Sequence, residues 1–173
     1  TLADPDAVLA LLAGDDSKDW YLLREGVALG IGPVPGDNQW WSFGGVTPLG
    51  DRPCVLDDVY TFHRSGQVSI NTNNTIFVDS DGNGGWMGDG SAEGCFDEST
   101  PGLWNAATGE DLSAFANGGD YTYVFDQSAG TITIEGAGFY IGLANKTADG
   151  DNYIPLQTKV YQVYNLAEGA IAD

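Results

Sequence analysis

The sequence predicts an all-β fold, an antiparallel β-sandwich or jelly roll, with one short helix at the N-terminus. Two observations support this prediction. Short runs alternate between apolar and polar residues, which is the period of a strand with one buried face. Segments rich in Gly, Asp and Asn separate these runs at close intervals, as turns do in sandwiches and jelly rolls. Because neither a repeat nor a linker is visible, we expect one domain over residues 1–173.

The helix is expected between Asp4 and Gly14. Asp4 can cap its start, and Pro5 suits the first helical position. Gly14 would end it. The apolar face between these ends consists of Val8, Leu9 and Leu12.

Strands follow where the apolar period becomes two. The runs YTF and QVSIN predict a hairpin, with HRSGQ as its turn. In the first run Tyr60 and Phe62 share a face, and in the second Val68 and Ile70 do. Further strands are expected from YTYVF, TITIEG, FYIGL and VYQVY.

The charge balance bears on the partners of the protein. Asp and Glu number 25 against 6 Lys and Arg, which gives a net charge of −19. Nucleic acid is therefore not expected as a partner, because binding to phosphates needs Lys and Arg. An acidic, solvated surface and a cation-binding surface both fit this charge. No apolar run is long enough to span a membrane, so we expect no membrane insertion of this domain.

Cys54 and Cys95 are the two cysteines of the chain. A disulfide and a pair of buried free thiols both fit this count. We predict the disulfide, because the chain has the composition of an exported protein. It would close a loop of roughly 40 residues, worth about 4 kcal/mol by the chain-entropy argument. With His63 as the single histidine and no CxxC spacing, a zinc site is not expected.

No pattern in the chain indicates catalysis. A Ser-His-Asp triad would have to use His63, which lies in a predicted strand, and no GxSxG motif is present. The ExDxxE strand pattern of jelly-roll endoglucanases is also absent. Asp57 and Asp58 lead into a strand, which would place their side chains on opposite faces. We therefore expect no enzymatic activity.

Aromatic residues are the most informative feature, because sugar rings present flat apolar faces that stack on flat aromatic side chains. In QWWSF, Trp41 and Phe43 share one face of an extended segment, so Trp41 is the expected core residue and Trp40 the expected platform. Trp86 and Trp104 lie outside any strand pattern. Each either tucks under its loop or is exposed for contact. The predicted ligand-binding residues are Trp40, Trp86 and Trp104.

Several short blocks resemble a glycan-binding domain type found in bacterial surface lipoproteins of polysaccharide-utilisation systems. LLAGDDSKDWYLL looks like the LLTGGxSKTWxL opening of that type, and GIGP and WWS follow in the same order. CVLDDVYTFHRSG fits its C-x-x-DD-x-[YF]-x-F-x-x-x-G stretch. ITIEGAGFYIGLANK and VYQVYNL resemble its end. The resemblance implies a non-catalytic β-sandwich that recognises glycans at the cell surface, beside other modules of the same protein.

This chain departs from the type at its end and in its charge. Such domains continue past YxVxxL with another strand, whereas this chain ends at AEGAIAD. The last strand is then missing, supplied differently or cut away. The abrupt start at Thr1 likewise suits a domain excised from a larger protein, or a mature fragment. The acidity exceeds what the type leads us to expect and suits a saline habitat.

The loop DSDGNGGWMGDG suggests a calcium site. Asp79, Asp81 and Asn83 match the first half of the D-x-[DN]-x-[DN]-G pattern, and Asp89 lies one position before the expected closing Glu. No helices are predicted on either side, so this is not an EF-hand. The alternative is an ordinary Asp- and Gly-rich connection. Asp57 and Asp58 are weaker candidates for a metal ligand.

The sequence thus predicts a non-catalytic polysaccharide-binding module of an extracellular or cell-surface protein, with calcium as a candidate cofactor. Two other functions stay open. One is an adhesin or structural module that calcium makes rigid. The other is a β-sandwich glycoside hydrolase or lyase whose carboxylates have no recognised pattern.

Overall fold

The computed structural model describes residues 5–78, 93–106, 108–147 and 154–167. Its largest unit is an antiparallel sheet of six strands in the order β1-β4-β5-β8-β9-β10, called the main sheet below. The strands are β1 (Ser17–Trp20), β4 (Val59–His63), β5 (Gln67–Asn71), β8 (Asp120–Asp126), β9 (Thr131–Glu135) and β10 (Thr158–Gln162).

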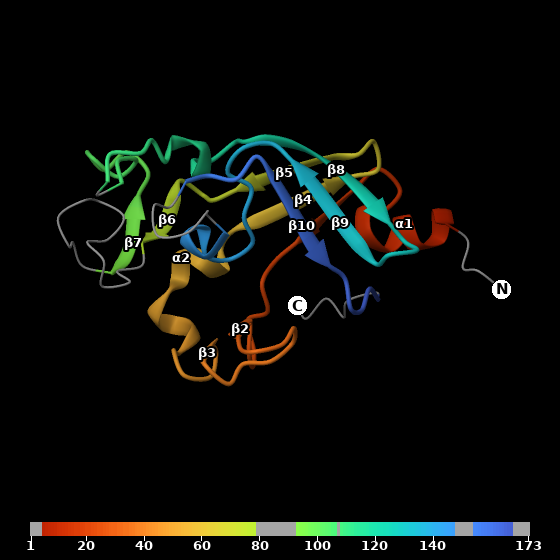
Figure 1. The fold of residues 1–173 in the computed structure, drawn as a ribbon, viewed down its shortest axis with the longest axis horizontal. Coiled ribbons are helices and arrows are strands. Elements are labelled where there is room, and N and C mark those ends of the chain that lie inside the picture. The colour runs from red at the N-terminus through yellow and green to blue at the C-terminus, as the bar shows by residue number, and fades with distance from the viewer. Residues whose placement is uncertain (1–4, 79–92, 107, 148–153, 168–173) are drawn as a thin grey trace.

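Two hairpins accompany the main sheet. One pairs β2 (Leu29–Ile31) with β3 (Trp41–Phe43), and the other pairs β6 (Thr75–Val78) with β7 (Gly94–Asp97). Figure 1 shows β2 and β3 below the main sheet and β6 and β7 at its left end. The helical elements are α1 (Pro5–Ala13), α2 (Pro53–Leu56) and the 3-10 turns Leu49–Asp51, Ser113–Phe115 and Ala144–Thr147. The predicted all-β antiparallel fold with a short N-terminal helix is confirmed.

The principal core lies against one face of the main sheet. Alternate residues of its central strands are buried there: Tyr60, Phe62, Val68, Ile70, Tyr121, Tyr123, Ile132 and Ile134. Phe139 packs against this face with its ring edge-on to Tyr60 and Tyr121, at centroid distances of 6.5 and 5.2 Å. The period of two that predicted these strands is therefore the period of their burial.

A smaller core holds the β2–β3 hairpin to the rest of the molecule. Its buried members are Phe43, Cys54, Val55, Phe77 and Leu143. They come from β3, α2, β6 and the segment after β9, so the hairpin packs against three separate parts of the chain.

Helix α1 ends as the sequence predicts. Gly14 adopts a positive φ of +62°, and its amide donates to the carbonyl of Ala10 at 2.9 Å. The hairpin turn between β4 and β5 is also confirmed, with Gly66 at φ +89°. Asp4, the predicted cap, lies outside the described residues.

The strand predicted from FYIGL is wrong. Residues 139–143 form no strand, although Phe139, Tyr140 and Leu143 are all buried. Gly138 and Gly142 have φ of +85° and +80°, which turns the backbone at both ends of the run. The amide of Gly142 donates to the Tyr60 hydroxyl at 2.9 Å instead of joining a ladder. A continuous apolar run here indicates a buried loop.

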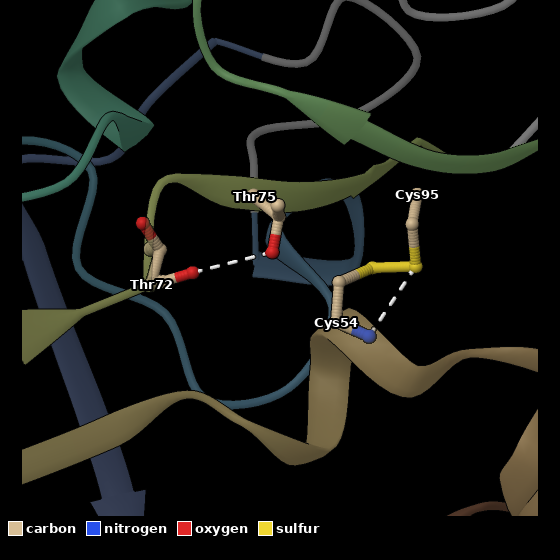
Figure 2. The surroundings of a disulfide bond; sticks show 4 residues. All are labelled: Cys54, Thr72, Thr75 and Cys95. Atoms are coloured by element: carbon tan, nitrogen blue, oxygen red, sulfur yellow. Dashed lines mark hydrogen bonds between the residues drawn. A yellow bond between two sulfur atoms is a disulfide. The ribbon is translucent and has the colours of Figure 1, made fainter.

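Cys54 and Cys95 form the predicted disulfide, with their Cα atoms 5.9 Å apart. Figure 2 shows Cys54 on α2 and Cys95 on β7, with the Cys54 amide donating to the Cys95 sulfur. The bridge therefore ties the β6–β7 hairpin to the element that precedes β4.

Replacing both cysteines by Ala should lower the free energy of unfolding by about 4 kcal/mol, because the bridged loop of 41 residues loses its constraint in the unfolded chain. Urea unfolding with and without reductant measures this change. Reductant should shift the wild-type midpoint and leave the double variant unchanged. A wild-type midpoint that does not respond to reductant would contradict the prediction.

Candidate functional site

The three predicted platform residues have different surroundings. Trp40 is 68% exposed, whereas Trp104 is half-buried against the principal core, and its indole N–H donates to the carbonyl of Glu98 at 3.2 Å. Trp86 lies outside the described residues. Within the described part of the chain, Trp40 is thus the predicted platform that presents most of its side chain to solvent.

Trp40 is held at the start of β3 by its backbone. Its amide donates to the carbonyl of Ile31 at 2.9 Å, next to the β2–β3 register in which Trp41 faces Ile31. At the other end of the ladder, the Ala28 amide donates to the Phe43 carbonyl at 2.8 Å. These bonds fix where the Trp40 side chain leaves the hairpin.

The neighbouring Trp41 anchors the hairpin from its other face. Its ring is stacked on Phe43, with centroids 6.4 Å apart and planes within 3°, as their shared face in the sequence predicts. The Trp41 indole N–H donates to the Thr47 hydroxyl at 2.9 Å. The guanidinium of Arg52 lies 4.9 Å from the centre of the same ring. Trp41 is therefore a structural residue, and it is less exposed than Trp40, as the sequence predicts.

Gly30 in β2 and Gly32 just after it allow the segment before Trp40 to lie directly on that strand. A Cβ atom at Gly32 would stand 2.7 Å from the Cβ of Asp37, and one at Gly30 would stand 2.9 Å from the Cβ of Asn38. Real Cβ atoms essentially never show contacts this short. A larger residue at Gly30 or Gly32 would therefore push residues 37–38 away. The GIG sequence is thus a requirement of this close approach.

Polar side chains accompany Trp40 along this segment. Asp37 accepts two hydrogen bonds from Gln39, one from its amide and one from its side-chain nitrogen, both at 2.9 Å. Asn38 and Gln39 are exposed. The segment DNQW therefore combines an exposed indole with exposed amide side chains, a group type that can donate to and accept from hydroxyls.

Exposed apolar side chains are concentrated in the same region. Of the ten large hydrophobic residues exposed in the described chain, six come from residues 21–46: Tyr21, Leu23, Val27, Val34, Trp40 and Val46. Single exposed hydrophobics are ordinary, but a concentration of them is typical of a contact surface. This region carries the β2–β3 hairpin.

The predicted calcium ligands Asp79, Asp81, Asn83 and Asp89 lie outside the described residues, so the calcium site stays a prediction. Among the residues that the structure describes, no group of three or more His, Cys, Asp or Glu side chains is placed to hold a metal ion. In the same part of the chain no helix is long and apolar enough to cross a membrane.

Asp58 is the most perturbed acid of the described chain. It is 2% exposed, and its Oδ2 accepts a hydrogen bond from the Tyr60 hydroxyl at 3.3 Å, while Oδ1 has no partner in the structure. Burial raises its pKa to about 8, and the nearby charges of Asp57 and Glu98 add to the rise. Asp58 is therefore largely protonated at neutral pH. Its neighbour Asp57 follows α2 and is less buried.

His63 lies at the end of β4 as predicted. Its backbone carbonyl accepts a hydrogen bond from the Tyr123 hydroxyl at 2.8 Å. Two surface depressions, of about 220 and 630 Å³, lie beside α1. Their walls include Leu9, Arg64 and Tyr123 in one case and Val8, Leu11 and Lys18 in the other. Neither depression contains a predicted site residue.

Comparison of the chain with protein-family models, with curated proteins and with solved structures finds no match. The resemblance to glycan-binding domains therefore rests on the sequence blocks themselves. Two of these blocks, GIGP and WWS, fall on β2 and at the start of β3. They coincide with the hairpin that carries Trp40.

The burial of Asp58 predicts that stability falls as pH rises. The folded protein keeps this proton up to a pH of about 8, whereas an unfolded Asp releases it near pH 4. The stability that protonated Asp58 contributes is fully present below the pKa of Asp in the unfolded chain. It is lost as pH rises through the pKa of Asp58 in the folded protein. The slope is on the order of 1 kcal/mol per pH unit.

Urea unfolding at several pH values between about 5 and 9 tests this prediction, with Asp58→Asn as the variant. The variant should lose the decline that Asp58 causes. Asp126→Asn is the control, because hydrogen bonds from Ser128 and Ala129 lower the pKa of Asp126, and its effect falls below this pH range. Equal slopes for wild type and Asp58→Asn would refute the assignment.

Proposed function

We propose that the protein is a non-catalytic polysaccharide-binding module and that Trp40 is its principal contact. The observation that carries the proposal is an indole that is 68% exposed on a hairpin whose other elements are firmly packed. An exposed Trp costs free energy in water, and stacking on the apolar face of a sugar ring recovers it.

The surroundings of Trp40 support a sugar as the ligand. The amide side chains of Asn38 and Gln39 lie in the same segment and match the donors and acceptors of sugar hydroxyls. The Trp40 side chain is 68% exposed, which suits a long polymer that lies across it. A platform held by a backbone ladder also costs little conformational entropy on binding, so more of the stacking free energy appears as affinity.

Two further considerations agree with this function. The resemblance blocks GIGP and WWS overlap the two strands of the hairpin. The disulfide is compatible with a protein outside the cytoplasm, where the proposed ligand is found. We propose that the protein acts at the cell surface or in the extracellular medium.

Replacing Trp40 by Ala should weaken polysaccharide binding roughly 5- to 150-fold, because such platforms contribute about 1–3 kcal/mol. Affinity gel electrophoresis over a panel of polysaccharides, followed by calorimetry with the polymer that binds, measures this loss. The variant should unfold at the same urea concentration as wild type, because the side chain is exposed.

Three further variants, two of which are controls, make the result specific. Val124→Ala removes an exposed apolar side chain from β8 of the main sheet and should leave both binding and stability unchanged. Gly32→Ala should weaken binding without touching the ligand, because its Cβ would displace Asp37, whereas Gly50→Ala meets open space and should not. A Trp40→Ala protein that binds the polymer as tightly as wild type would refute the platform.

A further inference from the structure

Resting on the proposed function, we infer that the glycan bound at Trp40 is electrically neutral and that polymers bearing uronate or sulfate groups are rejected. A polysaccharide-binding site for an anionic polymer needs Lys or Arg beside its platform, because fixed positive charge supplies both the attraction and the hydrogen bonds to carboxylate or sulfate. The charged residues between Arg24 and Arg52, the stretch that carries the β2–β3 hairpin, are negative.

The hairpin region contains no basic residue. Between Arg24 and Arg52 the sequence has 27 residues without Lys or Arg, and it includes the acids Glu25, Asp37 and Asp51. Asp37 lies three positions before Trp40, and both of its hydrogen bonds come from the neutral Gln39. Its negative charge is therefore not offset within the segment that forms the platform.

The two cations that border this region have other partners. Arg52 is buried, forms an ion pair with Glu93 at 2.8 Å, and lies over the rings of Trp41 and Phe77. The guanidinium of Arg24 lies 5.7 Å from the ring centre of Tyr21. Burial raises the pKa of Asp57, and the charge of Arg24 opposes that shift, so Arg24 interacts with this acid.

Two of the four more distant cations are engaged as well. Lys18 donates to the carbonyl of Leu11 and lies over the Trp20 ring, and Arg64 donates to the carbonyls of Gly14 and Asp6. The net charge of −19 adds a general repulsion at low salt. Because an anionic polymer carries a charge on many successive units, this repulsion accumulates along the chain, whereas a neutral polymer meets none of it.

The test compares one polymer in two charge states. The neutral polysaccharide that binds best in the panel is compared with its own derivative in which the primary alcohol at C6 is oxidised to a carboxylate. We expect the derivative to bind at least tenfold more weakly at about 0.02 M salt, and the difference to narrow at about 0.5 M, where the Debye length is only a few ångströms. Binding of the neutral polymer should not depend on salt.

A charge placed on the hairpin separates repulsion from loss of a hydroxyl contact. Val34 is 60% exposed in the segment between β2 and β3, and Val124 is 68% exposed on the main sheet. Val34→Lys should recover much of the affinity for the oxidised polymer. Val124→Lys changes the net charge equally, lies on a different surface, and should recover less.

Each outcome has a distinct meaning. Equal or tighter binding of the oxidised polymer, or of the native uronate and sulfated polymers in the panel, would overturn the inference and leave the polysaccharide-binding function in place. If both Lys variants recover affinity for the oxidised polymer equally, the selectivity does not come from charges near the hairpin, and this part of the inference is overturned. Failure to bind any polymer in the panel, neutral or anionic, would overturn the proposed function and the inference with it.

Discussion

The arrangement of the β2–β3 hairpin depends on the contacts of one buried group, the guanidinium of Arg52. It lies between the rings of Trp41 and Phe77, with centroid distances of 4.9 and 4.1 Å, and so joins β3 to β6. A buried charge is costly without a partner, and Glu93 supplies one at 2.8 Å. Two residues further along each segment, Cys54 and Cys95 form the disulfide. An ion pair and a covalent bond therefore fix the same two segments side by side.

This junction explains how a small hairpin can present an exposed Trp. A two-stranded hairpin alone is marginally stable in water, so its order must come from packing. Trp41 and Phe43 face the junction and the smaller core, and the alternation of a strand then directs the adjacent Trp40 away from them. Gly30 and Gly32 let the DNQW segment, which precedes β3, lie against β2. The platform is thus a consequence of the burial of its neighbour.

The strands with alternating residues were predictable because their burial follows the same period, as in Tyr121 and Tyr123 or Ile132 and Ile134. The exposure of Trp40 followed from the pairing of Trp41 with Phe43 for the same reason. The loop at residues 139–143 was not predictable, since an apolar run does not show whether its hydrogen bonds go to a neighbouring strand or to a side chain such as Tyr60. Nor does local sequence indicate that Trp104 packs on the principal core or that Arg52 meets Phe77, because those contacts join distant segments.

The most direct test of the central claim is fluorine NMR of protein labelled with 5-fluorotryptophan. The chain has five Trp residues, and Trp40→Phe identifies the resonance of Trp40 by its loss. Titration with a neutral polysaccharide that binds should shift or broaden this resonance saturably. The resonances of Trp20 and Trp41, which are packed against the two cores, should stay in place. A bound polymer that leaves the Trp40 resonance unchanged, while another Trp resonance responds, would contradict the account.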